Sequence, residues 1–276
     1  MPRYDLHSHS TASDGLLAPS ALIARAIEQR VDVLALTDHD DTDGLGEAQR
    51  AAQGSSLTLV NGVEISTTWR SHTVHVVGLH VDPANDALTA ALAHVREGRD
   101  ARAHRIAASL AQAGVPRAYE GARKYVTSDR LISRAHFARF LVEAGYGRST
   151  QDVFKRYLGE GKPGYVAHAW AAIGDAVSWI HAAGGQAVLA HPARYRVTAT
   201  GMRKLLGEFK DAGGDAIEVH SASHTFAQAE EFARHARVFA FLASAGSDYH
   251  GPGESWLELG AVAELPSWLE PVWSRW

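Results

Sequence analysis

The 276-residue sequence contains no cysteine. This absence excludes disulfide bonds, zinc sites built from thiolates, and cysteine nucleophiles. The chain also lacks a run of 18 apolar residues, so we expect no membrane span. Its first residues, MPRYDLHSHS, lack the charged and apolar regions of a secretory signal peptide. We therefore expect a cytoplasmic protein whose chemistry uses side chains other than cysteine.

Positive charge is scarce overall and unevenly placed. The net charge is −4, whereas general nucleic-acid-binding domains are usually basic. Residues 94–162 contain 14 Lys and Arg against 7 Asp and Glu, and the other residues contain 13 against 24. This asymmetry has two interpretations: a basic wall that faces a phosphorylated substrate beside an anionic metal site, or two ordinary solvated surfaces. Charge alone does not choose between them.

Alternating strand and helix patterns predict an α/β protein. Strands are expected at 4–7, 31–37, 57–64, 73–79, 186–191, 216–220 and 241–246. Helices are expected at 19–30, 44–53, 86–113, 133–144, 150–158, 175–183, 202–212 and 225–236. Repeated strand–helix units imply a mostly parallel sheet, here a barrel. Because the middle is helical and rich in Ala and Arg, we predict a barrel from 1–98 and 165–276, with a helical insertion at 99–164 that covers the active site.

Histidines and carboxylates gather at the ends of the predicted strands. The candidate metal ligands are His7, His9, Asp14, His39, Glu64, His75, His191, Asp248 and His250. Active sites of βα barrels lie at the carboxyl ends of the strands, which is where this pattern places them. Residues an odd number of positions apart in a strand point to opposite faces, so His72 and His75 cannot share a face. We choose His75, which lies on the same face as Thr73 and Val77. A single motif of this kind would more often consist of ordinary surface residues. Its repetition at several strand ends predicts a metal centre.

The spacing of these residues supports shared coordination. Residues two apart in an extended segment point the same way. His7 and His9 can therefore hold one ion together, and so can Asp248 and His250. Imidazole and carboxylate ligands without sulfur suit Mn, Zn, Fe or Mg. Nine ligands exceed the needs of one ion, so two or three ions are implied.

The same motifs resemble those of the PHP (polymerase and histidinol phosphatase) family of metal-dependent phosphoesterases. The matching stretches are Asp5–Ser10, Ser13–Gly15, Leu36–Asp40, Asn61–Ser66, His75–Gly78, Ala190–Pro192 and Gly246–His250. They follow one another along nearly the whole chain. The resemblance implies a distorted seven-stranded (β/α)7 barrel that holds three divalent metal ions. We expect Mn²⁺, and Fe, Zn or Mg are compatible with the same ligands.

The resemblance also implies how the ligands are shared. One ion would be held by His7, His9, Glu64 and Asp248, a second by Glu64, His75 and His191, and the third by Asp14, His39 and His250. Glu64 would bridge the first two ions. The implied reaction is in-line attack on phosphorus by a hydroxide that bridges two ions. The expected catalytic residues are Glu64, His191 and Asp248.

A closer resemblance is to the subfamily of nucleoside 3′,5′-bisphosphate phosphatases and the related 5′→3′ exoribonuclease RNase AM. It is carried by Ile132–Arg139, Gly161–Val166 and His191–Tyr195. Members commonly have Asp-Phe-His in the last motif, where this chain has Asp-Tyr-His at 248–250, and the ligands are unaffected. Phosphate charge is expected to be held by Arg134, Lys162 and Arg194, since guanidinium groups match phosphate oxygens. The further candidate substrate contacts are His136 and His224.

The leading hypothesis is a phosphatase that removes the 3′-phosphate of nucleoside 3′,5′-bisphosphates, such as pAp to AMP and phosphate. The same site could act as a 5′→3′ exoribonuclease on short 5′-phosphorylated RNA, because both reactions recognise a 5′-phosphate and cut a 3′ ester. A histidinol-phosphate phosphatase is an alternative, which the basic insertion disfavours because that substrate carries one phosphate. A metal-binding module without turnover is another, which the complete ligand set disfavours. No protein partner is predicted.

Overall fold

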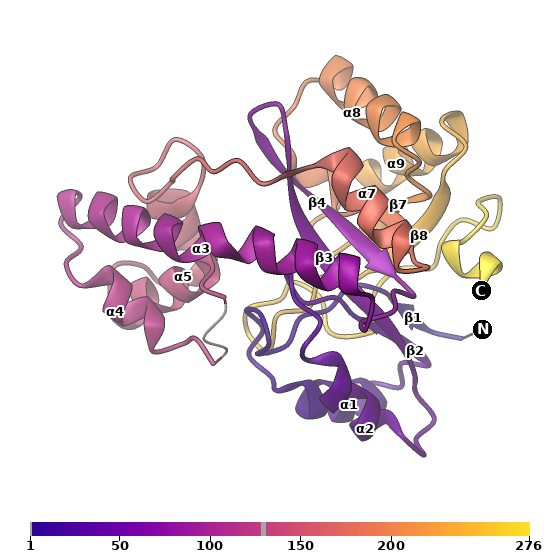
Figure 1. Ribbon diagram of the computed structural model, residues 1–276, viewed down its shortest axis with the longest axis horizontal. Helices are drawn as coiled ribbons and strands as arrows, with labels where there is room; N and C mark the ends of the chain where they lie inside the picture. The colour runs from indigo at the N-terminus through magenta and orange to yellow at the C-terminus, as the bar shows by residue number, and fades with distance from the viewer. Residues whose placement is uncertain (1, 128–130) are drawn as a thin grey trace.

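The computed structural model describes residues 2–127 and 131–276. Its centre is a curved sheet (Figure 1). The barrel strands are β1 (Tyr4–Asp5), β2 (Val33–Leu36), β3 (Thr58–Trp69), β4 (His72–Leu79), β6 (Gln186–Leu189), β7 (Ala216–Ser221) and β8 (Leu242–Gly246). They are neighbours in that order, and the short strand β5 (Ala171–Ala172) pairs with β3 outside this path.

The sheet curves into a nearly closed barrel. The amide of Leu6 donates to the carbonyl of Ala245 at 3.0 Å, and the amide of His9 donates to that of Tyr249 at 2.8 Å. The segment after β1 therefore meets β8 and the segment after it. Gly246 permits this approach, because a Cβ at that position would lie 2.3 Å from the Cβ of His7. The predicted distorted (β/α)7 barrel is confirmed.

Strand β4 departs from the parallel pattern. It is antiparallel to both β3 and β6, whereas the other pairs of the barrel path are parallel. A two-residue turn at Arg70 and Ser71 joins β3 to β4, and Arg70 has a φ of 57°. So short a connection can only join antiparallel strands. Strand β3 runs past its predicted end at 64, because its last residues pair with the start of β4.

Helices cover the outside of the barrel. They are α1 (Pro19–Glu28), α2 (Leu45–Ala52), α7 (Ile173–Ala182), α8 (Ala199–Asp211) and α9 (Phe226–Val238). Each lies within three residues of its predicted bounds. Short 3-10 turns lie at Pro192–Arg194, between β6 and α8, and at Val272–Arg275, near the end of the chain. Within the described part of the chain, no helix is both long and apolar enough to span a bilayer.

The middle of the chain forms a separate helical body, at the left of Figure 1. It contains α3 (Asp86–Gln112), α4 (Ala118–Arg123), α5 (Arg134–Glu143), α6 (Thr150–Val153) and the π-helical turn η1 (Phe154–Leu158). The sequence did not predict α4 or β5. It predicted one helix over 150–158, but the second half is a π turn because the amide of Gly159 donates to the carbonyl of Phe154.

Helix α3 links the two bodies, running from the barrel to the far end of the insertion (Figure 1). Its Leu88 and Leu92 belong to the large hydrophobic cluster of the barrel. Its Ile106 and Leu110 belong to a second cluster, which includes Phe137 of α5. One continuous helix therefore fixes the insertion relative to the barrel.

Candidate metal centre

All nine predicted ligands lie in one cluster at one end of the barrel. Their nitrogen and oxygen atoms form four groups whose members lie within 4.8 Å of one another. The groups are His7, His9 and Asp248; His7, Glu64 and His191; His39, Glu64 and His75; and His9, Asp14, His39 and His250. Because the groups share members, they form one continuous centre.

The first predicted ion site has the most regular geometry. Nε2 of His7 lies 3.4 Å from Oε2 of Glu64 and 3.6 Å from Oδ1 of Asp248. Nε2 of His9 lies 3.4 Å and 3.3 Å from the same two oxygens. Four ligand atoms placed tetrahedrally about 2.1 Å from one ion would be roughly 3.4 Å apart. These spacings therefore fit an ion between the four side chains.

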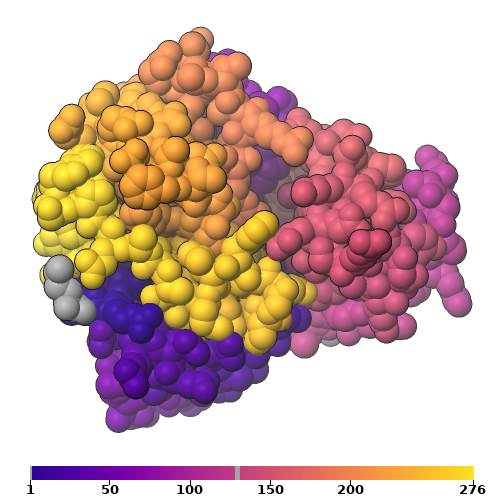
Figure 2. Space-filling model, turned by 180° about the vertical axis from the view of Figure 1, so that it is seen from behind, coloured from indigo at the N-terminus to yellow at the C-terminus, as the bar shows by residue number. Residues whose placement is uncertain are grey.

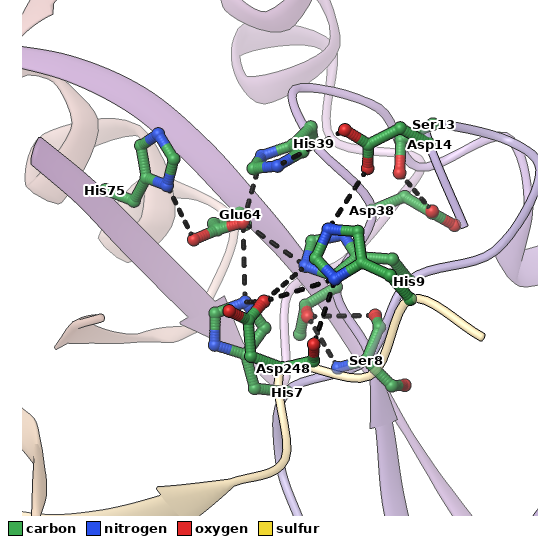
Figure 3. A network of polar contacts seen from close by, with 12 residues as sticks. His7, Ser8, His9, Ser13, Asp14, Asp38, His39, Glu64, His75 and Asp248 are labelled. Atoms are coloured by element: carbon green, nitrogen blue, oxygen red, sulfur yellow. Dashed lines mark hydrogen bonds and ion pairs between the residues drawn. The ribbon is translucent and has the colours of Figure 1, made fainter. Parts of the chain in front are cut away.

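Glu64 lies at the middle of the cluster (Figure 3). Its Oε1 is 2.8 Å from Nδ1 of His75 and 2.9 Å from Nε2 of His191. Its Oε2 faces His7 and His9 at 3.4 Å each, and lies 2.9 Å from Nδ1 of His39. Burial alone would raise the pKa of this carboxyl, but the imidazoles around it hold the pKa well below its usual range. An ionised carboxylate with its two oxygens in different ligand groups can bridge two ions.

The third predicted ion site is looser. Nε2 of His250 lies 3.4 Å from Oδ1 of Asp14, and Nε2 of His39 lies 3.9 Å from Oδ2 of Asp14. His9 belongs to this group by distance as well as to the first. The resemblance to the family had assigned His9 to the first ion alone.

The state of the ligand atoms fits divalent cations. Several of them are buried without a hydrogen-bond partner in the described structure: His7 Nε2, His9 Nδ1 and Nε2, Asp14 Oδ1, His39 Nδ1, Glu64 Oε2 and His191 Nδ1. Buried polar atoms normally have partners, so this concentration needs an explanation. Burial, followed by the nearby His250, lowers the pKa of His9 to about 3. Burial and then Arg194 lower that of His191 to about 3. Nearby carboxylates, acting against burial, raise the pKa of three other ligands, His7, His39 and His250, the last to about 9. Neutral imidazoles beside ionised carboxylates are the forms that bind metals, so a cation would displace the protons from these three rings.

Two of the ligands have unusual backbone conformations. His191 has a φ of 28° and Asp248 a φ of 51°, in the region that favours glycine. Such strain is concentrated at functional sites, where the surrounding structure compensates for it. At His191 part of the compensation is visible, because its amide donates to Oε2 of Glu218 at 2.6 Å.

Glu218 is a functional residue that sequence reasoning missed. Its Oε1 lies 2.6 Å from Nδ1 of His7. It fixes the ring so that Nε2 of His7 points toward the other ligands, which is how carboxylates commonly orient metal-binding imidazoles. The only signal in the sequence was one carboxylate among the apolar residues that begin strand β7.

Asp38 lies beside a ligand in the sequence but has a different role. Its carboxylate accepts hydrogen bonds from the amide of Ser10 at 2.8 Å, the hydroxyl of Ser10 at 2.6 Å and the hydroxyl of Ser13 at 2.5 Å. It therefore holds the loop that carries His9 and Asp14 (Figure 3).

A cavity lies between the ligand cluster and part of the insertion. Figure 2 shows the surface hollowed between the insertion, in pink, and barrel segments in orange and gold. Its lining includes seven of the nine ligands together with four arginines, namely Arg99, Arg102, Arg134 and Arg194. Trp170, Phe154 and Trp256 contribute aromatic surface. The cavity is thus lined by a metal-binding wall and a cationic wall.

Two of these arginines were not singled out from the sequence. Arg99 and Arg102 are 5% and 7% exposed, and their guanidinium carbons lie 4.8 Å and 5.3 Å from the ring centre of Trp170. Arg99 is bonded to the carboxylate of Asp40. Arg102 donates to the carbonyl of Val166 at 3.1 Å, and no carboxylate pairs with it among the described residues.

The unpaired charge of Arg102 indicates an anion-binding site. Burial, then Arg134 and Arg99 nearby, lower the pKa of Arg102 to about 9. Arg134 also has no carboxylate partner within the described residues, and Nη1 of Arg134 is 3.4 Å from the carbonyl of Leu158. An unpaired buried charge is costly. A bound anion would offset this cost.

The predicted substrate contacts are placed unevenly. Arg134 and Arg194 line the cavity, and Nη1 of Arg194 lies 2.6 Å from Oδ2 of Asp248. Their contact with substrate stays a prediction. Lys162 is exposed and is not part of the lining that the described residues form. Position in a basic segment therefore did not place its side chain at the cavity.

The two predicted histidine contacts are occupied by backbone groups. Nδ1 of His136 accepts the amide of Ser133 at 3.0 Å, within the cap of α5. Nε2 of His224 accepts the amide of Ala193 at 3.3 Å, and its Nδ1 donates to the carbonyl of Val219 at 2.9 Å. Neither ring is part of the cavity lining within the described residues. Both rings therefore support the loops that carry Arg134 and Arg194.

Known proteins with similar sequences share this architecture. The PHP domain family matches residues 5–169. A 3′,5′-nucleoside bisphosphate phosphatase from Chromobacterium violaceum is 47% identical over 273 residues, covering 99% of this chain and 96% of that protein. The 5′-3′ exoribonuclease Rnm of Escherichia coli is 45% identical over 275 residues, covering 99% and 93%.

A solved structure gives the same result. An amidohydrolase from Chromobacterium violaceum, with bound sulfate and no metal, is 47% identical with a TM-score of 0.95, covering 99% of this chain and 95% of that one. The match extends over the barrel and the insertion together. From its sequence, its fold and its ligand cluster, the chain belongs to the PHP domain family.

Proposed function

We propose that this protein is a metal-dependent phosphoesterase that hydrolyses the 3′-phosphate of nucleoside 3′,5′-bisphosphates. The observation that carries the proposal is the cavity with one metal-binding wall and one wall of arginines, two of them without a carboxylate partner in the described structure. A substrate with two phosphates can place one at the metal centre and the other against the arginines. The 47% identical relative named as a phosphatase of such compounds supports the assignment.

Three divalent ions are proposed, held by the ligand sets that the family resemblance implies. Mn²⁺ is the expected ion, and Fe, Zn and Mg share the same ligand preferences. When bound, such ions supply a nucleophile from water at neutral pH and neutralise charge on phosphoryl oxygens. The protein's part is to hold the ligands, and Glu64 is placed to bind two ions at once.

The arginines are proposed to divide the remaining work. Arg194 lies beside Asp248 at the ligand cluster, so it is placed to neutralise charge on the phosphoryl group that is transferred. Arg102 and Arg134 lie on the insertion wall, where they would bind the 5′-phosphate. Guanidinium groups can bind a phosphate through two parallel hydrogen bonds, which also fixes its orientation. Helices of the insertion would exclude water from the occupied cavity.

A 5′→3′ exoribonuclease is the second candidate, since Rnm of Escherichia coli is 45% identical. One feature of the cavity favours it. Trp256 borders the cavity and is 71% exposed. A base of a longer RNA could stack on such a ring, because aromatic side chains are common platforms for single-stranded nucleic acid. Both activities would use the same phosphate contacts and differ in the group that leaves.

One comparison of rates tests the proposal. A nucleoside 3′,5′-bisphosphate, a 5′-phosphorylated dinucleotide and histidinol phosphate would be hydrolysed side by side with Mn²⁺ present. We expect the bisphosphate to have the highest kcat/KM and histidinol phosphate the lowest. A faster dinucleotide would favour the exoribonuclease. Equal rates on histidinol phosphate would remove the role assigned to the second phosphate, and no turnover of any substrate would leave a metal-binding module.

A further inference from the structure

The insertion contacts a predicted metal ligand directly. Ser133 is the N-cap of helix α5, and its hydroxyl donates to Oδ2 of Asp14 at 2.7 Å. The hydroxyl oxygen of Ser133 accepts the amide of Ala135 at 3.0 Å. The other carboxylate oxygen of Asp14, Oδ1, is buried without a hydrogen-bond partner and lies 3.4 Å from Nε2 of His250. The cap of α5 therefore holds Asp14 with its free oxygen turned toward the third ion site.

A second contact joins α5 to the loops on both sides of that site. Nη2 of Arg139 donates to the backbone carbonyl of Asp14 at 2.5 Å. Nε and Nη2 of Arg139 each donate to the carboxylate of Glu254 at 2.8 Å. Arg139 is buried and Glu254 nearly so. Buried pairs with this two-point geometry are far less mobile than exposed ones, so they can set a distance.

Through Glu254, the contact with Arg139 also restrains the loop that carries His250. Glu254 belongs to the loop that follows His250, in which the hydroxyl of Ser255 accepts the amides of His250 at 2.7 Å and Gly251 at 3.1 Å. The amide of Glu254 also donates to the carbonyl of Gly251 at 3.3 Å. One arginine of the insertion thus connects the loop of Asp14 with the loop of His250.

We infer that Ser133 and Arg139 are positioning residues for the third metal ion, so that the insertion as well as the barrel builds that site. The inference rests on the three-ion centre of the proposed function. The first two sites are held differently, by barrel residues such as Glu218, which bonds both His7 and the amide of His191. Loss of a contact from α5 should therefore weaken one ion and spare the other two.

The chain offers a matched control for this inference. Arg25 of α1 also forms a two-point pair, with Nε and Nη2 at 2.9 Å and 2.5 Å from the carboxylate of Glu258. Glu258 lies a few residues after Glu254 in the same segment, but Arg25 reaches it from the barrel. The guanidinium of Arg25 lies 5.9 Å from the ring centre of Tyr249, and among the described residues it forms no hydrogen bond with Asp14 or His250. Arg25→Gln removes the same type of contact from the other side.

The test is a Mn²⁺ titration of the full chain. Free Mn²⁺ would be followed by electron paramagnetic resonance, with bound metal counted by elemental analysis. Variants Arg139→Gln and Ser133→Ala should bind two ions with unchanged affinity and the third at least about tenfold more weakly, as is usual when a group that orients a ligand is lost. Arg25→Gln should bind all three as the unaltered chain does. Circular dichroism and the unfolding midpoint would check that each variant is folded.

Two outcomes would overturn the inference. In the first, both variants bind three ions with unaltered affinity. In the second, both variants bind all three ions more weakly to the same degree, which would indicate a general loss of structure. If Arg139→Gln does not fold, Ser133→Ala alone decides, since it removes a single contact to Asp14 and a helix cap worth about 1 kcal/mol. If the unaltered chain binds fewer than three ions, the three-ion proposal itself fails, and that result appears before any substitution is made.

Discussion

The barrel wall and the insertion wall of the cavity differ in whether their charged side chains have partners of opposite charge. On the barrel wall, six imidazoles and three carboxylates lie among one another, so each charge has partners. On the insertion wall, Arg102 and Arg134 have no carboxylate partner among the described residues. The first arrangement is complete with cations bound, and the second is complete with an anion bound. The difference supports the proposal that the barrel wall holds metal and the insertion wall holds substrate.

Helix α3 shows the same contrast over one helical turn. Arg99 points to the barrel and pairs with Asp40, whereas Arg102 has no such partner among the described residues. Both lie over the ring of Trp170 and both are buried. Equal burial with unequal pairing separates a structural arginine from one available to a ligand.

Removing divalent cations should have the largest effect on activity. The barrel wall would then lose its bound charge while the arginine wall stayed as it is. We expect a chelator to abolish hydrolysis and added Mn²⁺ to restore it, with more than one ion bound per chain after loading. Elemental analysis and rate measurements on the same sample check this. At most one ion after careful loading would contradict a centre of nine ligands.

Glu64→Gln should have the next largest effect, because it removes the charge from the residue that reaches two ion sites. We expect a rate lower by roughly 10³-fold or more, equal to about 4 kcal/mol of transition-state stabilisation, with loss of bound metal. Glu230→Gln, an exposed change on α9, is the control. Full metal content with a tenth of the activity would remove Glu64 from the mechanism.

Replacing each α3 arginine by methionine sharpens the contrast between them. Arg99→Met leaves Asp40 buried without its partner, so the free energy of unfolding should fall by about 3 kcal/mol. Arg102→Met removes an unpaired buried charge, so this free energy should stay the same or rise by about 1 kcal/mol. Urea unfolding without ligand measures both. Equal losses would show that Arg102 is as well paired as Arg99.

Arg102→Met should still impair catalysis. Its kcat/KM on a nucleoside 3′,5′-bisphosphate should fall although the protein is no less stable, and bound metal should not change. A variant that is both more stable and fully active would mean that the charge of Arg102 does not bind substrate.

Arg134→Ala should have the smallest effect and tests the second phosphate. We expect the unaltered protein to prefer a 3′,5′-bisphosphate over the matching 3′-monophosphate by at least about tenfold in kcat/KM, roughly 1.4 kcal/mol. Arg134→Ala should narrow that preference without changing bound metal. Arg148→Ala, an exposed change in the insertion, is the control. A proportional loss on both substrates would show that Arg134 does not recognise the 5′-phosphate.

The barrel and its ligand cluster were predictable because their signals are local. Strand and helix periodicity repeats along the chain, and most of the ligands lie at or just after strand ends, where a βα barrel brings distant segments together. Glu64 and His75 are the exceptions, since they lie within β3 and β4. That His7 and His9 point the same way follows from their spacing of two residues in an extended segment. The cluster therefore formed as expected, although His9 proved close to two ion sites.

The insertion wall was not predictable in the same way. Lys162 lies in the basic segment but is exposed and does not line the cavity that the described residues form, whereas Arg102 lines it and was not singled out. A count of charges along a segment does not say which side chains a helix turns inward. That depends on how α3 and α5 pack on each other.

The sequence by itself indicated the strands and helices of the barrel, the nine candidate ligands and a basic helical segment, because each follows from residue type and short spacing. Only the tertiary structure decided which groups orient those ligands. Glu218 meets His7 across 211 residues, and Ser133 meets Asp14 across 119. No periodic pattern connects residues so far apart. Whether a buried charge finds a partner is settled when the elements pack, and at this site that pairing distinguishes the groups that hold the fold from those left for a ligand.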